Sequence, residues 1–212
     1  IALTIQTLRA QLTKALAEPL PGKLAHEPMR ATPIGDLLPD FKHALPPKPG
    51  SVLILLYEEN GLIRFPLIKR PTYSGAHSGQ ISLPGGKAES GETFVETALR
   101  EGEEEIGIDR SEIDVIGHLS NFFVIPSNFM VTPVVAIAQH TPLLRPDKRE
   151  VENILLGDLR QLLDPNAIRT KEIVAAGKFK MRAPHFEIQN EIVWGATAMM
   201  LNELRVVLQK IR

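Results

Sequence analysis

The feature that most constrains this chain is a glycine pair, Gly85-Gly86, followed by a helical segment rich in glutamate. Thr93 with Glu96 three residues later is a capping-box pattern, in which each residue bonds the backbone of the other. Gly107 stands where a left-handed residue would end a helix. The pattern therefore predicts a helix over residues 93–106.

Two faces of this helix have different chemistry. At about 100° per residue, an apolar arc that we expect to face the core gathers Val95, Ala98, Leu99, Gly102 and Ile106. A second arc gathers Glu101, Glu104 and Glu105, with Thr97 beside them and Arg100 at the margin, while Glu96 and Glu103 point to solvent. Like charges on one face destabilise a helix, most of all near the negative end of its dipole.

A bound cation would relieve this repulsion. A solvated acidic face is the commoner alternative in general, but no lysine follows these glutamates at i+4, and Arg100 can orient a carboxylate. Oxygen ligands suit Mg²⁺ or Mn²⁺, which activate water and neutralise phosphate charge. We expect Pro84-Gly85-Gly86 to leave a strand and form a tight loop whose backbone amides approach a ligand.

The rest of the chain shows strand and helix patterns, with no repeat, low-complexity tract or flexible linker that would mark a second domain. The predicted elements are a helix over 4–17, strands over 52–57 and 62–68 joined at Asn60-Gly61, strands over 113–119 and 130–138, a strand and helix over 154–163, a strand over 187–193, and a helix over 194–209. Pro133 predicts an edge strand or a bulge. The proline-rich arm over 19–49 is expected to lie across the core or against a second subunit.

Composition excludes several classes of protein. With 24 basic and 25 acidic side chains, the chain is not expected to coat nucleic acid or an anionic membrane. It has no cysteine, which excludes disulfides, thiolate metal sites and cysteine nucleophiles, and suits a reducing cytoplasm. Its apolar runs fall far short of the about 20 residues of a membrane helix. We therefore expect a cytoplasmic protein.

The segment from Gly86 to Ile108 resembles the Nudix box. The matching positions are Gly86, Glu92, Arg100, Glu101, Glu104, Glu105, Gly107 and Ile108. Gly102 stands where the box has an apolar side chain. Since a glycine inside a helix costs about 1 kcal/mol relative to alanine, we expect the helix to pack closely on the sheet at this point.

The resemblance implies an α/β/α sandwich on a mixed sheet, and Mg²⁺- or Mn²⁺-dependent hydrolysis of a nucleoside diphosphate linked to another group. Carried over by position, Glu101, Glu104 and Glu105 would be metal ligands, with Glu104 also a candidate base, Arg100 their orienting partner and Glu92 a structural carboxylate. In the family the base can also come from a loop outside the box. Glu150 and Glu152 are the candidates here, with a solvated charge run as the alternative for this stretch.

The residues before the box resemble the extension that marks coenzyme A pyrophosphatases. The shared parts are a basic residue after the strand, then Gly79-Gln80 and an apolar residue before Pro-Gly-Gly, while Gly75 and Leu83 depart from the pattern. The stretch 192–198 also resembles that subgroup, with Trp194 expected as a core anchor and Gly195-Ala196 as a site of close packing. The expected substrate-binding residues are Lys69, Arg70, His77, Gly85, Gly86 and Lys87.

Three functions follow as alternatives. The leading one is hydrolysis of coenzyme A or its thioesters to 3′,5′-ADP and 4′-phosphopantetheine. The second is hydrolysis of ADP-ribose, NADH or another nucleoside diphosphate derivative, and the third is a sensor that binds a nucleotide without cleaving it. For all three we expect residues 1–50 to pack as an arm on a Nudix domain over 51–212, and a homodimer as the candidate assembly.

Overall fold

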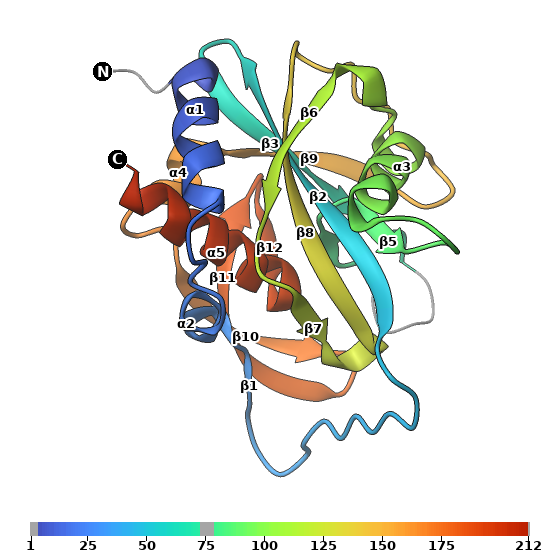
Figure 1. Ribbon diagram of the computed structural model, residues 1–212. Helices are drawn as coiled ribbons and strands as arrows, with labels where there is room; N and C mark the ends of the chain where they lie inside the picture. Colours follow the sequence, from blue (N-terminus) through green and yellow to red (C-terminus); the bar gives the residue numbers. More distant parts are fainter. Residues whose placement is uncertain (1–3, 73–78, 212) are drawn as a thin grey trace.

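The structure is a computed structural model, and it describes residues 4–72 and 79–211. A twisted mixed sheet crosses the middle of the molecule, with helix α3 (Phe94–Ile106) on one face (Figure 1). Helices α1 (Ile5–Leu16) and α5 (Gly195–Lys210) lie on the other face. This arrangement confirms the predicted α/β/α sandwich.

Strand β2 (Lys48–Glu59) organises the larger sheet. On one edge it pairs in parallel with β8 (Phe129–Ala138). On its other edge it pairs antiparallel with β5 (Gly85–Lys87) and then with β3 (Leu62–Lys69). The sheet is completed by β4 (Ile81–Ser82), β6 (Ile113–His118), β7 (Phe122–Val124) and β9 (Asn153–Asp158).

Side chains of β2 alternate between two cores. Leu53, Leu55 and Tyr57 pack in the core under α3, and Ile54 and Leu56 pack in the core under α1 and α5. A strand buried on both faces needs an unbroken apolar run, which is why residues 52–57 show no polar alternation. Each such leucine removed from water contributes about 1.5–3 kcal/mol.

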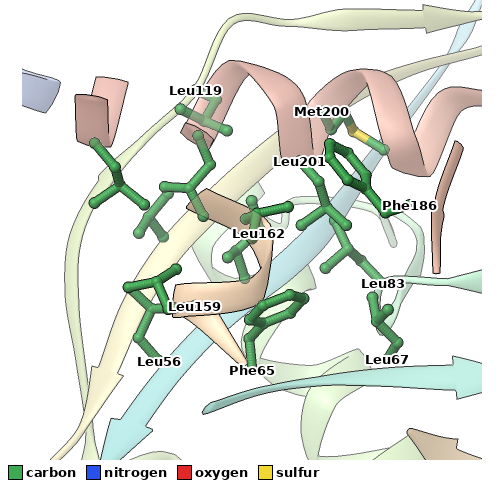
Figure 2. Packing of buried hydrophobic residues seen from close by; sticks show 14 of the residues in the cluster. Leu56, Phe65, Leu67, Leu83, Leu119, Leu159, Leu162, Phe186, Met200 and Leu201 are labelled. Carbon is green, nitrogen blue, oxygen red and sulfur yellow. The ribbon is translucent and has the colours of Figure 1, made fainter. Parts of the chain in front are cut away.

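The core beneath α5 is the larger of the two. Side chains from β2, β3, α4 (Leu159–Leu163) and α5 meet there, as Figure 2 shows for Leu56, Phe65, Leu159 and Leu201. The predicted strand and helix over 154–163 are therefore confirmed as β9 and α4. The helices predicted at the two ends of the chain are confirmed as α1 and α5.

A smaller sheet covers the lower part of the molecule in Figure 1. Its strands are β1 (Thr32–Pro33), β10 (Arg169–Ala175), β11 (Phe179–Ile188) and β12 (Glu191–Trp194). The prediction of one strand over 187–193 is wrong, because the chain reverses at Gln189 and Asn190, which both have positive φ. The hairpin of β10 and β11 has no counterpart among the predicted elements.

The prediction from Pro133 is also wrong. Strand β8 lies inside the sheet between β2 and β6, so it is not an edge strand. The register shift lies in β6, between Val115 and Gly117, and not at the proline. Pro133 pairs with Val52 on one side and accepts the backbone N–H of Leu119 on the other, just before β7 takes over as neighbour.

The arm over 19–49 contains more regular structure than expected, with α2 (Lys23–His26), the 3₁₀ turn η1 (Glu27–Met29) and β1. Further 3₁₀ turns are η2 (Arg110–Glu112) and η3 (Ile125–Ser127). The arm is tied to α5 by the fully buried carboxylate of Glu203. Glu203 accepts the backbone N–H of Gly22 at 3.0 Å and the Ser120 hydroxyl at 2.6 Å, and pairs with His26 Nε2 at 2.9 Å.

The turn into α5 differs from its prediction in two respects. Trp194 is only half-buried. Gly195 has a φ of +63°, and beyond its chain neighbours and the backbone of its own helix no atom of the described residues lies within 4 Å of the place where a Cβ would stand. This glycine is therefore required by the backbone turn between β12 and α5, rather than by close packing.

Candidate active site

Helix α3 begins and ends where its sequence predicts. The Thr93 hydroxyl accepts the backbone N–H of Glu96 at 3.2 Å, and Glu96 accepts the backbone N–H of Thr93 at 2.7 Å, which completes the capping box. Gly107 ends the helix with a φ of +71°. A Cβ on Gly102 would lie 2.8 Å from both Ile108 and Leu53, so the expected close packing of α3 on β2 is confirmed.

Glu101, Glu104 and Glu105, the three glutamates predicted to share one helical face, differ in depth. The Glu105 side chain is 1% exposed, that of Glu101 is 13% exposed, and that of Glu104 is 55% exposed. Burial raises the pKa of Glu105 to about 7, against the opposing effects of Arg70 and the backbone N–H of Gly85. Burial also raises the pKa of Glu101 above its ordinary value. The three carboxylates of Glu105, Glu101 and Glu104 therefore form a row that runs from the core to solvent, and we call it the acidic row.

Arg100 joins this row to the segment before the helix. Its guanidinium donates to Glu92 Oε1 at 2.7 Å, to Glu101 Oε1 at 3.0 Å and to Glu104 Oε2 at 3.1 Å. The bond from Arg100 is the main reason that the pKa of Glu92 falls to about 2. Arg100 thus sits where an orienting partner of the carboxylates was expected, and Glu92 holds Arg100.

Gly85 and Gly86 lie in strand β5, so the prediction of a tight loop at this point is wrong. A Cβ on Gly85 would lie 2.3 Å from the Ser51 carbonyl oxygen, because β5 runs close to β2. A Cβ on Gly86 would lie 2.3 Å from Glu101 Oε1. The Gly85 N–H donates to Glu105 Oε2 at 2.8 Å. Because the two glycines have no side chains, the carboxylates of Glu101 and Glu105 can both pack against β5.

The expected basic residues follow at the end of β3. Arg70 Nη2 lies 3.3 Å from Glu105 Oε1, so the structure brings Arg70 to the acidic row. Lys69 Nζ instead lies 2.7 Å from Glu191 Oε1, at the start of β12. Lys87 is exposed on β5, and His77 lies outside the described residues.

Glu191 is not among the residues that the sequence pattern singles out. A two-residue turn, Gln189-Asn190, between alternating apolar segments could have predicted the hairpin that carries it. Its pairing with Lys69 could not have been found from local pattern, because the two residues lie 122 positions apart.

The two loop glutamates take different positions. The loop before them is fixed to the end of α3, where the backbone N–H of Asp147 donates to the Glu105 carbonyl at 3.0 Å. Glu150 is exposed, and its negative charge adds to the raised pKa of Glu101 and Glu105. Glu152 donates its backbone N–H to the Lys69 carbonyl. Glu150 is therefore the loop glutamate whose charge acts on the acidic row.

Within residues 4–72 and 79–211, no three His, Asp or Glu side chains already converge on one metal position. The contacts explain this, because Arg100 bonds Glu101 and Glu104 while Arg70 contacts Glu105. The donors nevertheless suit a hard divalent cation, since they are all carboxylate oxygens. The Glu101 carboxylate occupies the place that a Cβ on Gly86 would fill, so only glycine lets this donor lie against β5.

A cavity of about 570 Å³ lies elsewhere in the molecule. Its lining includes Arg64, Asp158, Gln161, Arg169 and Glu187. Among the described residues that line it, none belongs to α3 or β5. The cavity therefore contains neither the Nudix-box carboxylates nor the glycine strand, and we take the acidic face of α3 beside β5, which has both, as the candidate active site.

Comparison with known proteins shows the family to which the chain belongs. The model of the NUDIX domain matches residues 47–177, more than half of the chain, and this range includes the whole acidic helix. The chain belongs to the Nudix family. The matched range also includes Lys69, Arg70 and the Nudix-box glycines.

Several curated Nudix proteins are similar to the chain. Nudix hydrolase 22, chloroplastic, of Arabidopsis thaliana is 36% identical over 163 residues, which cover 73% of this chain and 53% of the relative. The peroxisomal coenzyme A diphosphatase NUDT7 of Mus musculus is 28% identical over 157 residues, which cover 71% of this chain and 66% of the relative. The chain spans about half the length of the first of these relatives.

Among solved structures, a Nudix hydrolase from M. smegmatis, RenU, superposes with a TM-score of 0.51 at 18% sequence identity. The match covers 79% of this chain and 90% of that one, and it supports the Nudix fold. Across the described part of the chain, no helix has both the length and the apolar character to cross a membrane.

Proposed function

We propose that this Nudix chain hydrolyses the diphosphate of coenzyme A or its thioesters, giving 3′,5′-ADP and 4′-phosphopantetheine or its acyl derivative. The observation that carries the hydrolytic part is the meeting of strand β5 with the acidic row, where the Glu101 carboxylate packs directly on Gly86 and the Gly85 N–H donates to Glu105. A coenzyme A substrate is supported by the extension before the Nudix box and by the similarity to a relative named a coenzyme A diphosphatase.

In this proposal Glu101, Glu104 and Glu105 hold Mg²⁺ or Mn²⁺. The cation, when bound, supplies charge neutralisation at the phosphates and activation of water. Arg100 keeps Glu101 and Glu104 at fixed positions through its bonds at 3.0 and 3.1 Å. The backbone of β5 and the side chains of Lys69, Arg70, His77 and Lys87 bind the charged substrate.

The proton acceptor is Glu104 or Glu150. Glu104 is the most exposed of the three glutamates proposed to bind the metal, so it can contact water. Glu150 is exposed on the neighbouring loop, and its charge acts on Glu101 and Glu105. Glu104→Gln and Glu150→Gln are compared for kcat against pH at saturating substrate and metal. The base is the residue whose variant loses about 100-fold or more in kcat together with the acidic limb of the pH profile.

A substrate panel tests the proposal. Coenzyme A, its 3′-dephospho form, ADP-ribose and NADH are incubated with Mg²⁺ or Mn²⁺ and with chelator, and the phosphate products are identified by mass. Preferred cleavage of coenzyme A to the two named products supports the proposal. Preferred cleavage of ADP-ribose or NADH favours the second candidate function, and binding without product favours a sensor.

A matched pair of variants tests the metal assignment. Glu105→Gln removes a buried carboxylate of the acidic row, whereas Glu103→Gln changes an exposed carboxylate on the same helix that pairs with Arg110. We expect turnover to be lost in the first and kept in the second. Unchanged turnover in Glu105→Gln contradicts the assignment.

The proposal extends to a cytoplasmic location and a homodimer. The absence of cysteine from the sequence supports a reducing compartment. Light scattering of the purified chain determines its assembly, and a monomer at all concentrations contradicts the dimer.

A further inference from the structure

Lys69, the last residue of β3, and Arg70, which follows it, are held in different ways. Lys69 pairs with Glu191 of β12 at 2.7 Å, outside the Nudix helix. Arg70 contacts Glu105, a carboxylate that the proposed function assigns to metal binding. The Arg70 guanidinium therefore lies next to a proposed metal ligand, and the Lys69 ammonium group does not.

The contact of Arg70 is weak in its geometry. Arg70 Nη2 lies 3.3 Å from Glu105 Oε1 and 3.4 Å from the Gly85 carbonyl oxygen, whereas Arg100 Nε approaches Glu92 at 2.7 Å. Charge-assisted bonds of full strength lie at about 2.7–2.9 Å. The Arg70 backbone is fixed, because its N–H donates to the Gln80 carbonyl, but its side chain is 27% exposed.

The two oxygens of Glu105 have different partners. Oε2 accepts the Gly85 backbone N–H at 2.8 Å, and this bond joins two rigid elements, α3 and β5. Oε1 faces Arg70. A cation that binds Glu105 therefore needs the same oxygen that Arg70 contacts, and it would stand next to a guanidinium of like charge.

We propose that Arg70 is an internal counter-ion of Glu105, and that a divalent cation displaces it from this carboxylate. The released guanidinium then faces the substrate, where its planar donors fit phosphate oxygens. In this way cation binding makes a phosphate-binding group available. The inference rests on the proposed function, because it takes Glu105 as a metal ligand.

The test measures Mn²⁺ binding to the full chain by calorimetry, without substrate, at fixed pH and ionic strength. Arg70→Gln removes the competing charge, so Mn²⁺ should bind about tenfold more tightly. Arg70→Lys keeps the charge and should stay near the parent. Lys69→Gln removes the same charge one residue away, from a side chain paired with Glu191, and should also stay near the parent.

Different results overturn the inference. Equal or weaker Mn²⁺ binding in Arg70→Gln would mean that Arg70 orients Glu105 for the cation instead of competing with it. An equal gain in Mn²⁺ affinity in Lys69→Gln would mean that the effect comes from the lost net charge and not from the contact between Arg70 and Glu105. A thermal melt of each variant establishes that it is folded.

A second measurement uses the parent chain and decides the matter if Arg70→Gln does not fold. The side-chain Nε–H signal of Arg70 is identified in a ¹⁵N spectrum as the arginine signal missing from Arg70→Lys. Mg²⁺ addition should shift this signal, and a signal unchanged at saturation overturns the inference. A parent chain that binds neither ion contradicts the metal part of the proposed function as well. Metal binding with the expected Arg70 effect but no hydrolysis contradicts the proposed function alone.

Discussion

Arg100 and Glu92 form a two-pronged ion pair across eight residues of sequence, with Nε 2.7 Å from Oε1 and Nη2 3.1 Å from Oε2. The guanidinium also donates to the Lys87 carbonyl at 3.0 Å. The pair therefore fixes both the strand that carries the glycines and the helix that carries the carboxylates. Loss of this pair should therefore lower both the stability of the fold and the turnover of the enzyme.

We expect Arg100→Ala to lower the free energy of unfolding by about 2–3 kcal/mol, because it leaves the half-buried Glu92 without its charged partner. Turnover should fall as well, since Glu101 and Glu104 lose the same donor. Urea unfolding and initial rates measure the two effects. Arg110→Ala, which breaks an exposed pair with Glu103, is the control and should change stability far less, because water screens exposed pairs.

Two glycine substitutions should separate catalysis from packing. Gly86→Ala places a methyl group on Glu101, so turnover should fall about tenfold or more with metal present. Gly102→Ala instead crowds Ile108 and Leu53, so it should lower the free energy of unfolding by about 1–3 kcal/mol with turnover largely kept. Full turnover in Gly86→Ala would contradict the role given to this space.

The capping box of α3 should contribute measurably to stability. Thr93→Ala removes the acceptor for the Glu96 backbone N–H and should cost about 0.5–2 kcal/mol. Thr93→Ser retains a hydroxyl at the same position and should recover most of this loss. Thermal unfolding of the three proteins at one pH provides the comparison.

The buried Glu203 should make stability depend on pH. Burial alone would raise its pKa, but bonds from His26, Ser120 and Gly22 outweigh burial and hold the pKa below its ordinary value of 4.5. A carboxylate whose pKa is lower in the folded state stabilises it above the unfolded pKa, and this contribution disappears as the pH falls through the folded pKa.

The parent should therefore be more stable than Glu203→Gln at pH 7, by about 2–3 kcal/mol. This difference should shrink as the pH falls below 4.5, the ordinary pKa of the carboxyl. Urea unfolding from pH 7 to pH 3 follows it, with Glu18→Gln on the exposed segment after α1 as a control. A difference that stays constant with pH would contradict a charged Glu203 in the folded chain.

Local patterns predict α3 well because its limits are set within the helix itself. The capping residues, the left-handed glycine and the apolar arc all act over a few positions, so the sequence contains them directly. The same is true of the hairpin at Asn60-Gly61, where both residues have positive φ.

Contacts between distant segments of the chain cannot be predicted from local sequence patterns. Gly85-Gly86 has the composition of a turn, yet its pairing with β2 makes it a strand. Glu203 lies 177 positions from His26, and nothing near either residue indicates the other. The partners of Lys69 and Arg70 likewise depend on how β3, β12 and α3 are brought together.

Strand β2 pairs with the glycine strand β5 through residues 50–52 and with β3 through residues 57–59. The distance between the backbone of β5 and the β3 hairpin is thus set by the number of residues along one strand. A single insertion or deletion between these two segments would shift one against the other by a residue and turn the intervening side chains to the opposite face. The length of β2 therefore limits how the spacing of the site can change, even though β2 itself supplies no side chain to the acidic row.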